Sequence, residues 1–276
     1  MDMMLVLGIL ALIYCISLFL MCVYRFKINT KLWNTVFIIA DFVAFSCWTY
    51  ASYQRGSLGG GWMTLDNISP LMFTMILLTP FMKDRFKDCV FSAIAFLNVG
   101  MFIALFISPE HSYIFSFNRE ATLMYTAEAV CHMLCSLYGI YLVLSNQVKP
   151  DFGHWLKSAA FLYSVITFSV ILNFVYHRSH FGMDPYGGAS IYMIDIFGSF
   201  WATLVAYYLG IAVVITLGMQ IAYFVDKATA LVHHHEHDDA VAQNDTDPTS
   251  NDGVNNDESV NKSEDDTSIE EEPATE

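Results

Sequence analysis

The feature that most limits the fold of this chain is a series of apolar stretches, each bounded by charged or turn-forming residues. An α-helix rises about 1.5 Å per residue, so about 20 apolar residues cross the roughly 30 Å hydrocarbon core of a bilayer. Seven stretches have the required character, and they cover residues 3–24, 33–53, 69–82, 89–108, 122–145, 155–176 and 191–224. We therefore expect an all-α, polytopic membrane helix bundle with about seven transmembrane helices.

Two of these stretches depart from the usual length. Residues 69–82 make only about 21 Å of uncharged helix, which either thins the bilayer or re-enters it without crossing. Ser69 followed by Pro70 is typical of a helix start, and Pro80 can kink the far end. Residues 191–224 would make about 51 Å of helix, so we expect the first part to lie along the surface or to kink near Gly198.

Charge is distributed unevenly along the chain. The net charge of −14 belongs to the C-terminal end, because acidic and basic residues balance over residues 1–227. The loops between the predicted helices alternate between more and fewer basic residues, with Arg25, Lys27 and Lys31 after the first helix and only Arg55 after the second. The positive-inside rule therefore places the N-terminus outside and the C-terminus inside.

Two further segments follow the predicted bundle of residues 1–226. Residues 227–239 form a His-rich juxtamembrane segment, which either binds Zn or Ni or serves as a solvated polar linker. Its candidate metal ligands are His233, His234, His235 and His237. Residues 240–276 are rich in Asp, Glu, Asn and Ser without an apolar period, so we expect a disordered acidic tail. No other cofactor is expected.

Several polar residues fall inside the predicted helices, where an ionisable group costs about 2.5 to 3.5 kcal/mol on insertion scales and marks a candidate functional site. The alternating topology places Thr74, His132 and Asn173 toward the outer face, where a pocket could open. The residues that could line a polar pocket are Asp41, Asn98, Asn173 and Asp195.

Glu128 and His132 are four residues apart, so they lie one turn apart on the same face of the fifth predicted helix. A carboxylate beside an imidazole fixes the tautomer of the ring and raises its basicity, as a general base requires. The same pair could instead hold helices together or carry protons across the membrane. The sequence leaves these three alternatives open.

The seven-helix pattern, the Pro70-Leu71 opening of the third helix, His132 and Asn173 together resemble the YwaF-like integral membrane proteins over residues 1–224. In that family the third helix begins Pro-Leu-(His/Gln)-Leu-Cys, whereas this chain reads Pro70-Leu71-Met72-Phe73-Thr74. A eukaryotic branch of the family moves acyl chains between phospholipids with that cysteine as nucleophile and the histidine as its partner. The resemblance implies that Thr74 is the nucleophile and His132 the base.

The sequence thus favours a lipid-directed acyltransferase or hydrolase of the plasma membrane, with Thr74, His132 and Glu128 as catalytic residues. Helix geometry puts Thr74 and His132 about 8 Å apart in depth. A direct hydrogen bond between them would require helix tilt that closes this difference. The alternatives are a permease or proton-coupled carrier that uses Asp41, Glu128 and Asp195, and a non-catalytic scaffold that signals through its tail. We expect membrane lipids as partners and no nucleic acid.

Overall fold

The computed structural model describes residues 3–27, 29–54, 68–99, 122–177, 181 and 198–244. Within these ranges the chain is helical and contains no strand, which confirms the all-α class. The 3₁₀ turns η1 (Arg25–Lys27) and η2 (Thr79–Phe81) follow the first and third helices. In chain order the α-helices are α1 (Met3–Val23), α2 (Thr30–Gln54), α3 (Ile68–Leu78), α4 (Asp84–Asn98), α6 (Thr122–Leu144), α7 (Phe152–Tyr176) and α9 (Phe200–Asn244).

Five of these helices, α1, α2, α6, α7 and α9, are long and apolar enough to cross a membrane. Their outer surfaces expose large apolar side chains, such as Leu12 on α1, Phe42 on α2 and Leu217 on α9. So much contiguous apolar surface is unfavourable in water, whereas it is well solvated by lipid. The chain is therefore a multi-pass helical membrane protein.

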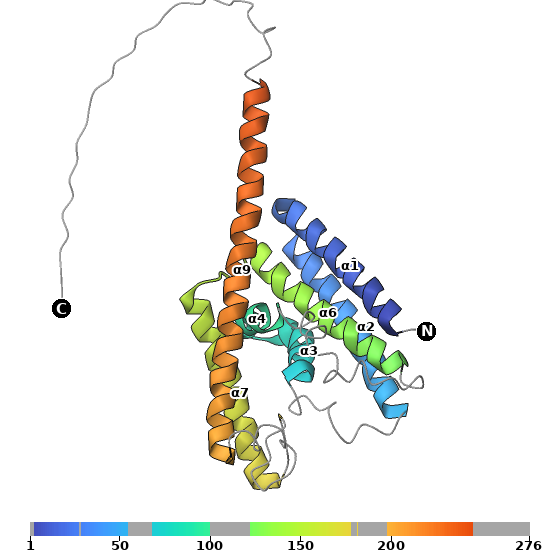
Figure 1. Cartoon of the computed structure of the whole chain (residues 1–276), viewed down its shortest axis with the longest axis vertical. Coiled ribbons are helices and arrows are strands. Elements are labelled where there is room, and N and C mark those ends of the chain that lie inside the picture. The colour runs from blue at the N-terminus through green and yellow to red at the C-terminus, as the bar shows by residue number, and fades with distance from the viewer. Residues whose placement is uncertain are drawn as a thin grey trace, which may run out of the picture. The chain divides into compact units, whose positions relative to one another are not determined.

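α6 is the central helix of the first compact unit of the chain, Met1–His233. It packs against α1, α2, α3 and α4, and 83% of its most apolar stretch is buried in the bundle. Tyr138 and Tyr141 stack on each other there, and Phe37 of α2 packs on both rings. Figure 1 shows α1, α2 and α6 as one group and α7 and α9 as another, with α3 and α4 between them.

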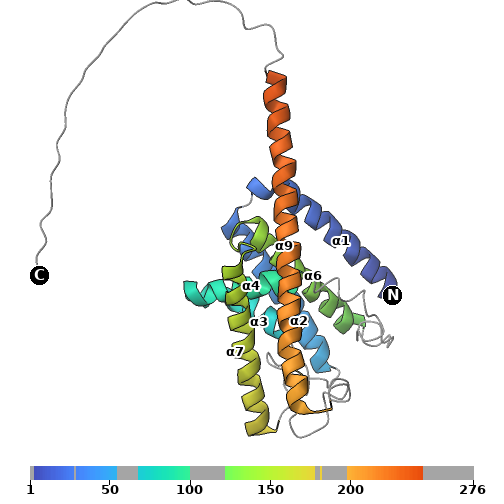
Figure 2. The same cartoon turned by 60° about the vertical axis from the view of Figure 1, so that its left-hand side comes forward.

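α4 is the most deeply buried short helix, since every residue from Val90 to Asn98 is buried. Small residues let its backbone approach its neighbours closely: a Cβ on Gly139 of α6 would lie 2.9 Å from the Ile94 carbonyl oxygen, and one on Gly218 of α9 would overlap the Phe96 carbonyl. Figure 2 shows α4 running across α7 and α9 and not along them. α4 thus runs across the bundle and packs between α6 and α9.

The start of α9 agrees with the kink predicted near Gly198. Gly198 has a φ of +72°, a conformation that L side chains rarely adopt, and the helix begins two residues later at Phe200. The Ser199 hydroxyl accepts a hydrogen bond from the Ala202 N–H at 3.2 Å, as a helix cap does. At its other end α9 continues through the predicted juxtamembrane segment to Asn244. Residues 245–276 lie outside the described ranges.

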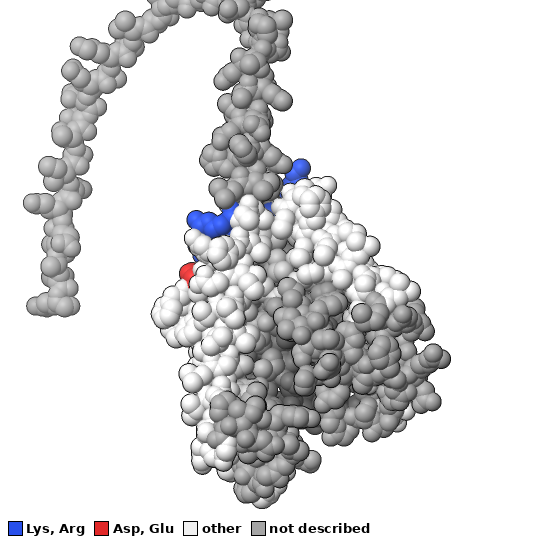
Figure 3. All heavy atoms as spheres, in the orientation of Figure 1, with Lys and Arg blue, Asp and Glu red and all other residues white. Residues whose placement is uncertain are grey.

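The described basic side chains gather at one end of the bundle. On the face shown in Figure 3, Lys and Arg cluster at that end, and the described surface away from it carries no charge. These basic residues come from the end of α1, the start of α2, the α3–α4 turn, the α6–α7 turn and α9. They are Arg25, Lys27, Lys31, Lys83, Arg85, Lys87, Lys149, Lys157 and Lys227. The positive-inside rule predicts that this end is the inner one, and the terms inner and outer follow that prediction.

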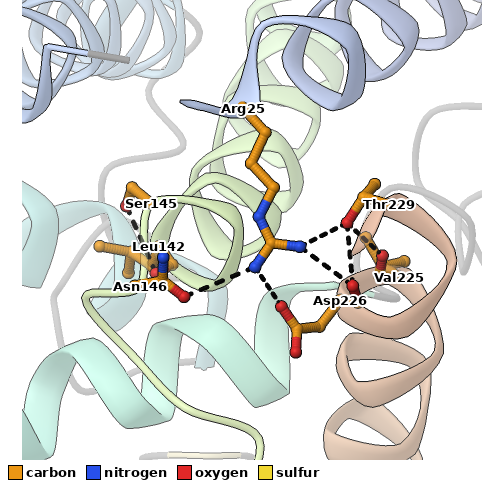
Figure 4. Close-up of polar contacts among 7 residues, drawn as sticks. All are labelled: Arg25, Leu142, Ser145, Asn146, Val225, Asp226 and Thr229. Atoms are coloured by element: carbon orange, nitrogen blue, oxygen red, sulfur yellow. Dashed lines mark hydrogen bonds and ion pairs between the residues drawn. The ribbon is translucent and has the colours of Figure 1, made fainter. Parts of the chain in front are cut away.

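A buried arginine joins three of the segments at this basic end (Figure 4). The Arg25 guanidinium forms an ion pair with the Asp226 carboxylate and donates to the Asp226 carbonyl at 3.0 Å and to the Thr229 hydroxyl at 2.6 Å. It also reaches the Asn146 side-chain oxygen at 3.5 Å. The end of α1, the turn after α6 and the inner part of α9 are therefore fastened together through one side chain.

Candidate functional site

His132 lies on α6 in the middle of the bundle and is only 7% exposed. Its Nδ1 atom is 2.8 Å from the backbone carbonyl oxygen of Glu128, and its Nε2 atom is 3.0 Å from the hydroxyl of Ser69 at the start of α3. Both ring nitrogens are thus engaged, one by its own helix and one by α3.

The chemistry of these partners fixes the tautomer of the ring. A carbonyl oxygen can only accept, so Nδ1 carries the proton and donates it to Glu128. Nε2 then has the lone pair and accepts the hydrogen bond from the Ser69 hydroxyl. A hydroxyl that donates to an oriented imidazole is the arrangement of a nucleophile with its general base.

Aromatic rings surround the imidazole on the side of α2 and α3. The edge of Phe73, one turn after Ser69, meets the His132 ring with centroids 5.4 Å apart. Phe45 and Trp48 of α2 pack against Phe73 at 5.8 and 6.3 Å. These rings keep water from the imidazole on that side and separate it from the lipid-facing surface of α2.

The depth of the pair follows from its position along α6. His132 lies about 15 Å from the start of α6 and about 18 Å from its inner end, which places it near the middle of the membrane. Because Ser69 contacts His132, α3 begins in the interior of the bundle and not at the membrane surface. The positive end of the α3 helix dipole therefore lies beside the serine.

α3 and α4 together lie between the level of His132 and the basic end of the bundle. After α3 the chain reaches the basic end, where Asp88 forms an ion pair with Lys157 in the second turn of α7. α4 then returns to the interior, and the Val99 carbonyl at its end accepts a hydrogen bond from Ser136 of α6 at 2.9 Å. Residues 55–67 and 100–121, which would complete two crossings, lie outside the described residues, so the count of seven crossings stays a prediction.

The structure gives Thr74 a different place from the one that its predicted role requires. Its hydroxyl donates to the Pro70 carbonyl one turn back at 2.8 Å, while the hydroxyl on the His132 imidazole is that of Ser69. The other ring nitrogen also has a different partner from the predicted one. The backbone carbonyl of Glu128, and not its carboxylate, orients His132. His132 is the predicted residue that takes part in this contact.

Asp41 and Asn98 are buried as predicted, at 1% and 0% exposure, but the described contacts do not join them to the Ser69–His132 pair. In the described part of the chain, neither oxygen of the Asp41 carboxylate nor the amide group of Asn98 has a hydrogen-bond partner. Asp41 lies on α2, which packs against α6. Asp41 thus marks a second polar position on the α2 side of α6.

The remaining predicted site residues lie elsewhere or outside the described ranges. Asn173 is buried near the outer end of α7. Asp195 is not among the described residues. The side chains of His233, His234, His235 and His237 are likewise not described, although their backbone belongs to α9. Among the described residues, no group of His, Cys, Asp and Glu has the geometry to hold a metal ion.

Ser69 is the residue that sequence reasoning did not assign to the site. The pattern Ser69-Pro70 was sufficient to predict a helix start, and a serine at such a position is ordinarily a cap. Its contact with His132 depends on how α3 packs on α6, which no pattern within either helix encodes.

No known family, curated protein or solved structure matches this chain.

Proposed function

We propose that this protein is a membrane-embedded acyltransferase or hydrolase of lipid esters, in which Ser69 is the nucleophile and His132 the general base. The observation that carries the proposal is the 3.0 Å contact between the Ser69 hydroxyl and Nε2 of an imidazole whose Nδ1–H is held by the Glu128 carbonyl. The proposal keeps His132 from the resemblance to the YwaF-like proteins and replaces Thr74 by Ser69 as the nucleophile.

The proposed reaction proceeds by two acyl transfers. His132 takes the proton of the Ser69 hydroxyl as its oxygen attacks the ester carbonyl carbon, and the protonated ring returns that proton to the alcohol when the ester C–O bond breaks. The acyl group is then on Ser69, with the alcohol released. Water or the hydroxyl of a second lipid, deprotonated by His132, then attacks the acyl carbon. The bond between that carbon and the serine oxygen breaks, and the ring returns the proton to the serine oxygen.

The start of α3 supplies electrostatic support for the charge that develops on the ester oxygen. The positive end of the α3 helix dipole lies beside Ser69, and the Phe73 ring packs against the imidazole at the same place. A fixed dipole in such a site stabilises an oxyanion better than solvent does.

Labelling with a lipid-tailed fluorophosphonate in nanodiscs tests the assignment of the nucleophile. We expect the probe to modify Ser69, as read by mass spectrometry, and we expect Ser69→Ala and His132→Gln to lower ester turnover by about a thousandfold. Thr74→Val serves as the matched hydroxyl variant on the same helix and should retain labelling. Labelling that survives Ser69→Ala but disappears with Thr74→Val would return the role to Thr74, and an inert wild type would refute catalysis.

Asp41 supports a second candidate function, that of a proton-coupled carrier. A buried carboxylate without a hydrogen-bond partner is costly when charged, so a site of this kind exchanges a proton or a cation as its environment changes. In liposomes with a pH-sensitive dye inside, a carrier would move protons, Asp41→Asn would abolish the flux, and Ser69→Ala would leave it intact. Absence of flux in the wild type would eliminate this candidate.

A further inference from the structure

A groove runs along the membrane-facing side of α2 where α3 packs against it. It has a volume of about 610 Å³, and its described lining residues are Phe42, Phe45, Ser46, Thr49, Tyr50, Tyr53 and Leu77. All but Leu77 lie on α2 at spacings of one, three or four residues, so they form one continuous stripe about 16 Å long.

The lining indicates the chemistry of the occupant. No charged side chain is among the described lining residues, and the Thr49 hydroxyl is used within α2, where it donates to the Phe45 carbonyl at 2.8 Å. Tyr50 and Tyr53 are exposed and lie toward the outer end of α2, the level at which tyrosine meets lipid headgroups. The groove is therefore apolar along its length, with phenolic hydroxyls at the headgroup end.

The position of the groove in the membrane matches that of a lipid chain. Phe42 lies about 18 Å from either end of α2, so the stripe extends from the middle of the bilayer to the outer interface. The acyl chains of an outer-leaflet lipid occupy this depth, and they are the medium that surrounds an exposed apolar groove in a membrane.

The groove is also connected to the candidate site. Phe45, one of its walls, packs edge-on against Phe73 at 5.8 Å, and Phe73 packs edge-on against His132 at 5.4 Å. A single ring, that of Phe73, thus lies between the groove wall and the imidazole. A lipid whose chain occupies the groove contacts α3 at Leu77, near the end of that helix, and is one aromatic ring away from His132.

We propose that the groove between α2 and α3 binds one acyl chain of an outer-leaflet lipid, and that it selects long-chain esters as substrates of Ser69. The selectivity for long chains rests on the proposed function, whereas chain binding itself does not. A chain that reaches from Tyr53 to Phe42 buries the whole stripe, while a short chain leaves the inner part unfilled. The hydrophobic effect then favours the long chain, because each buried methylene contributes to binding.

The binding part of the proposal is tested without catalysis, in full-length Ser69→Ala protein in phosphatidylcholine nanodiscs. Phosphatidylcholine with a diazirine near the end of its palmitoyl chain is photolysed, and the modified peptides are identified by mass spectrometry. We expect modification to concentrate on the groove residues of α2 and on Leu77. Ser46→Phe, which fills the groove, should lower this signal about tenfold.

Val43→Phe is the matched control, because Val43 is exposed on α2 at the same depth but does not line the groove. It should leave the modification pattern unchanged. Equal modification of every lipid-facing helix, or an equal loss with Ser46→Phe and Val43→Phe, would overturn the proposal.

The selectivity part is tested by comparing palmitoyl with octanoyl esters. Wild-type protein and Val43→Phe should prefer the palmitoyl ester, and Ser46→Phe should reduce that preference about tenfold while octanoyl turnover remains. An unchanged ratio would refute selection by the groove. If no protein turns over either ester but photolysis still modifies the groove, chain binding stands and the proposed catalysis fails.

Discussion

A helix turns about 100° per residue, so the side chains of Ser69 and Thr74 point in directions about 140° apart around α3. Only one of them can lie on the face that meets α6. The contacts of His132 with both Ser69 and Phe73 identify that face. The YwaF-like pattern that the sequence resembles has its nucleophile at the position of Thr74, but the rotation of α3 against α6 decides which hydroxyl meets the imidazole.

A prediction at the scale of one residue concerns Arg25. Arg25→Ala removes an ion pair and three hydrogen bonds and leaves the Asp226 carboxylate only partly solvated, at 30% exposure. We expect a loss of about 2 to 3 kcal/mol, read as a lower Tm in detergent. Lys27→Ala, which removes a neighbouring exposed cation, should leave the Tm unchanged, and equal shifts for the two variants would contradict the assigned role.

At the scale of elements, α4 determines how the two groups of helices come together. It contacts α6 and α7 extensively and receives Gly218 of α9 directly against its backbone. In a membrane, lipid is as apolar as the helix surfaces, so close backbone packing and not water exclusion holds such helices together. The fit of α4 between its neighbours therefore depends on the absence of side chains at Gly139 and Gly218.

The corresponding prediction is that Gly218→Ala separates α9 from α4. The new methyl group would overlap the Phe96 carbonyl, which is backbone and cannot move aside, so we expect a loss of about 1 to 3 kcal/mol, or more, in thermal unfolding. Gly210→Ala on the same helix has open space around it and should be neutral or stabilising. A Tm for Gly218→Ala equal to that of Gly210→Ala would show that the helices are not in close contact.

At the scale of the whole molecule, hydropathy was sufficient to predict the all-α class, the short third helix and the irregular start of the last one. Loop charge predicted that the basic residues share one end, and the described ones do. The site was predicted only through His132, because its partners come from another helix and from its own backbone. A contact such as that between Ser69 and His132 depends on packing across helices, which periodicity along one helix does not specify.

The orientation of the chain is the same whether α3 and α4 cross the membrane or form a re-entrant pair, since either arrangement returns the chain to the outer side before α6. We therefore predict that Lys31→Cys and Lys149→Cys, in a cysteine-free background, react with an impermeant maleimide only after cells are permeabilised. Ser57→Cys, between α2 and α3 in the sequence, should react on intact cells. Reaction of Lys149→Cys on intact cells would show that the chain has the opposite orientation.

The start of α3 in the middle of the membrane has a consequence for the fate of an acyl group on Ser69. Water is scarce at that depth, whereas lipids with free hydroxyl groups arrive there by lateral diffusion through the bilayer. The supply of acceptors, and not the chemistry of the serine, then sets the product. Such a site would exchange chains among lipids far more often than it released fatty acids, and would alter which chains a membrane carries without changing how many.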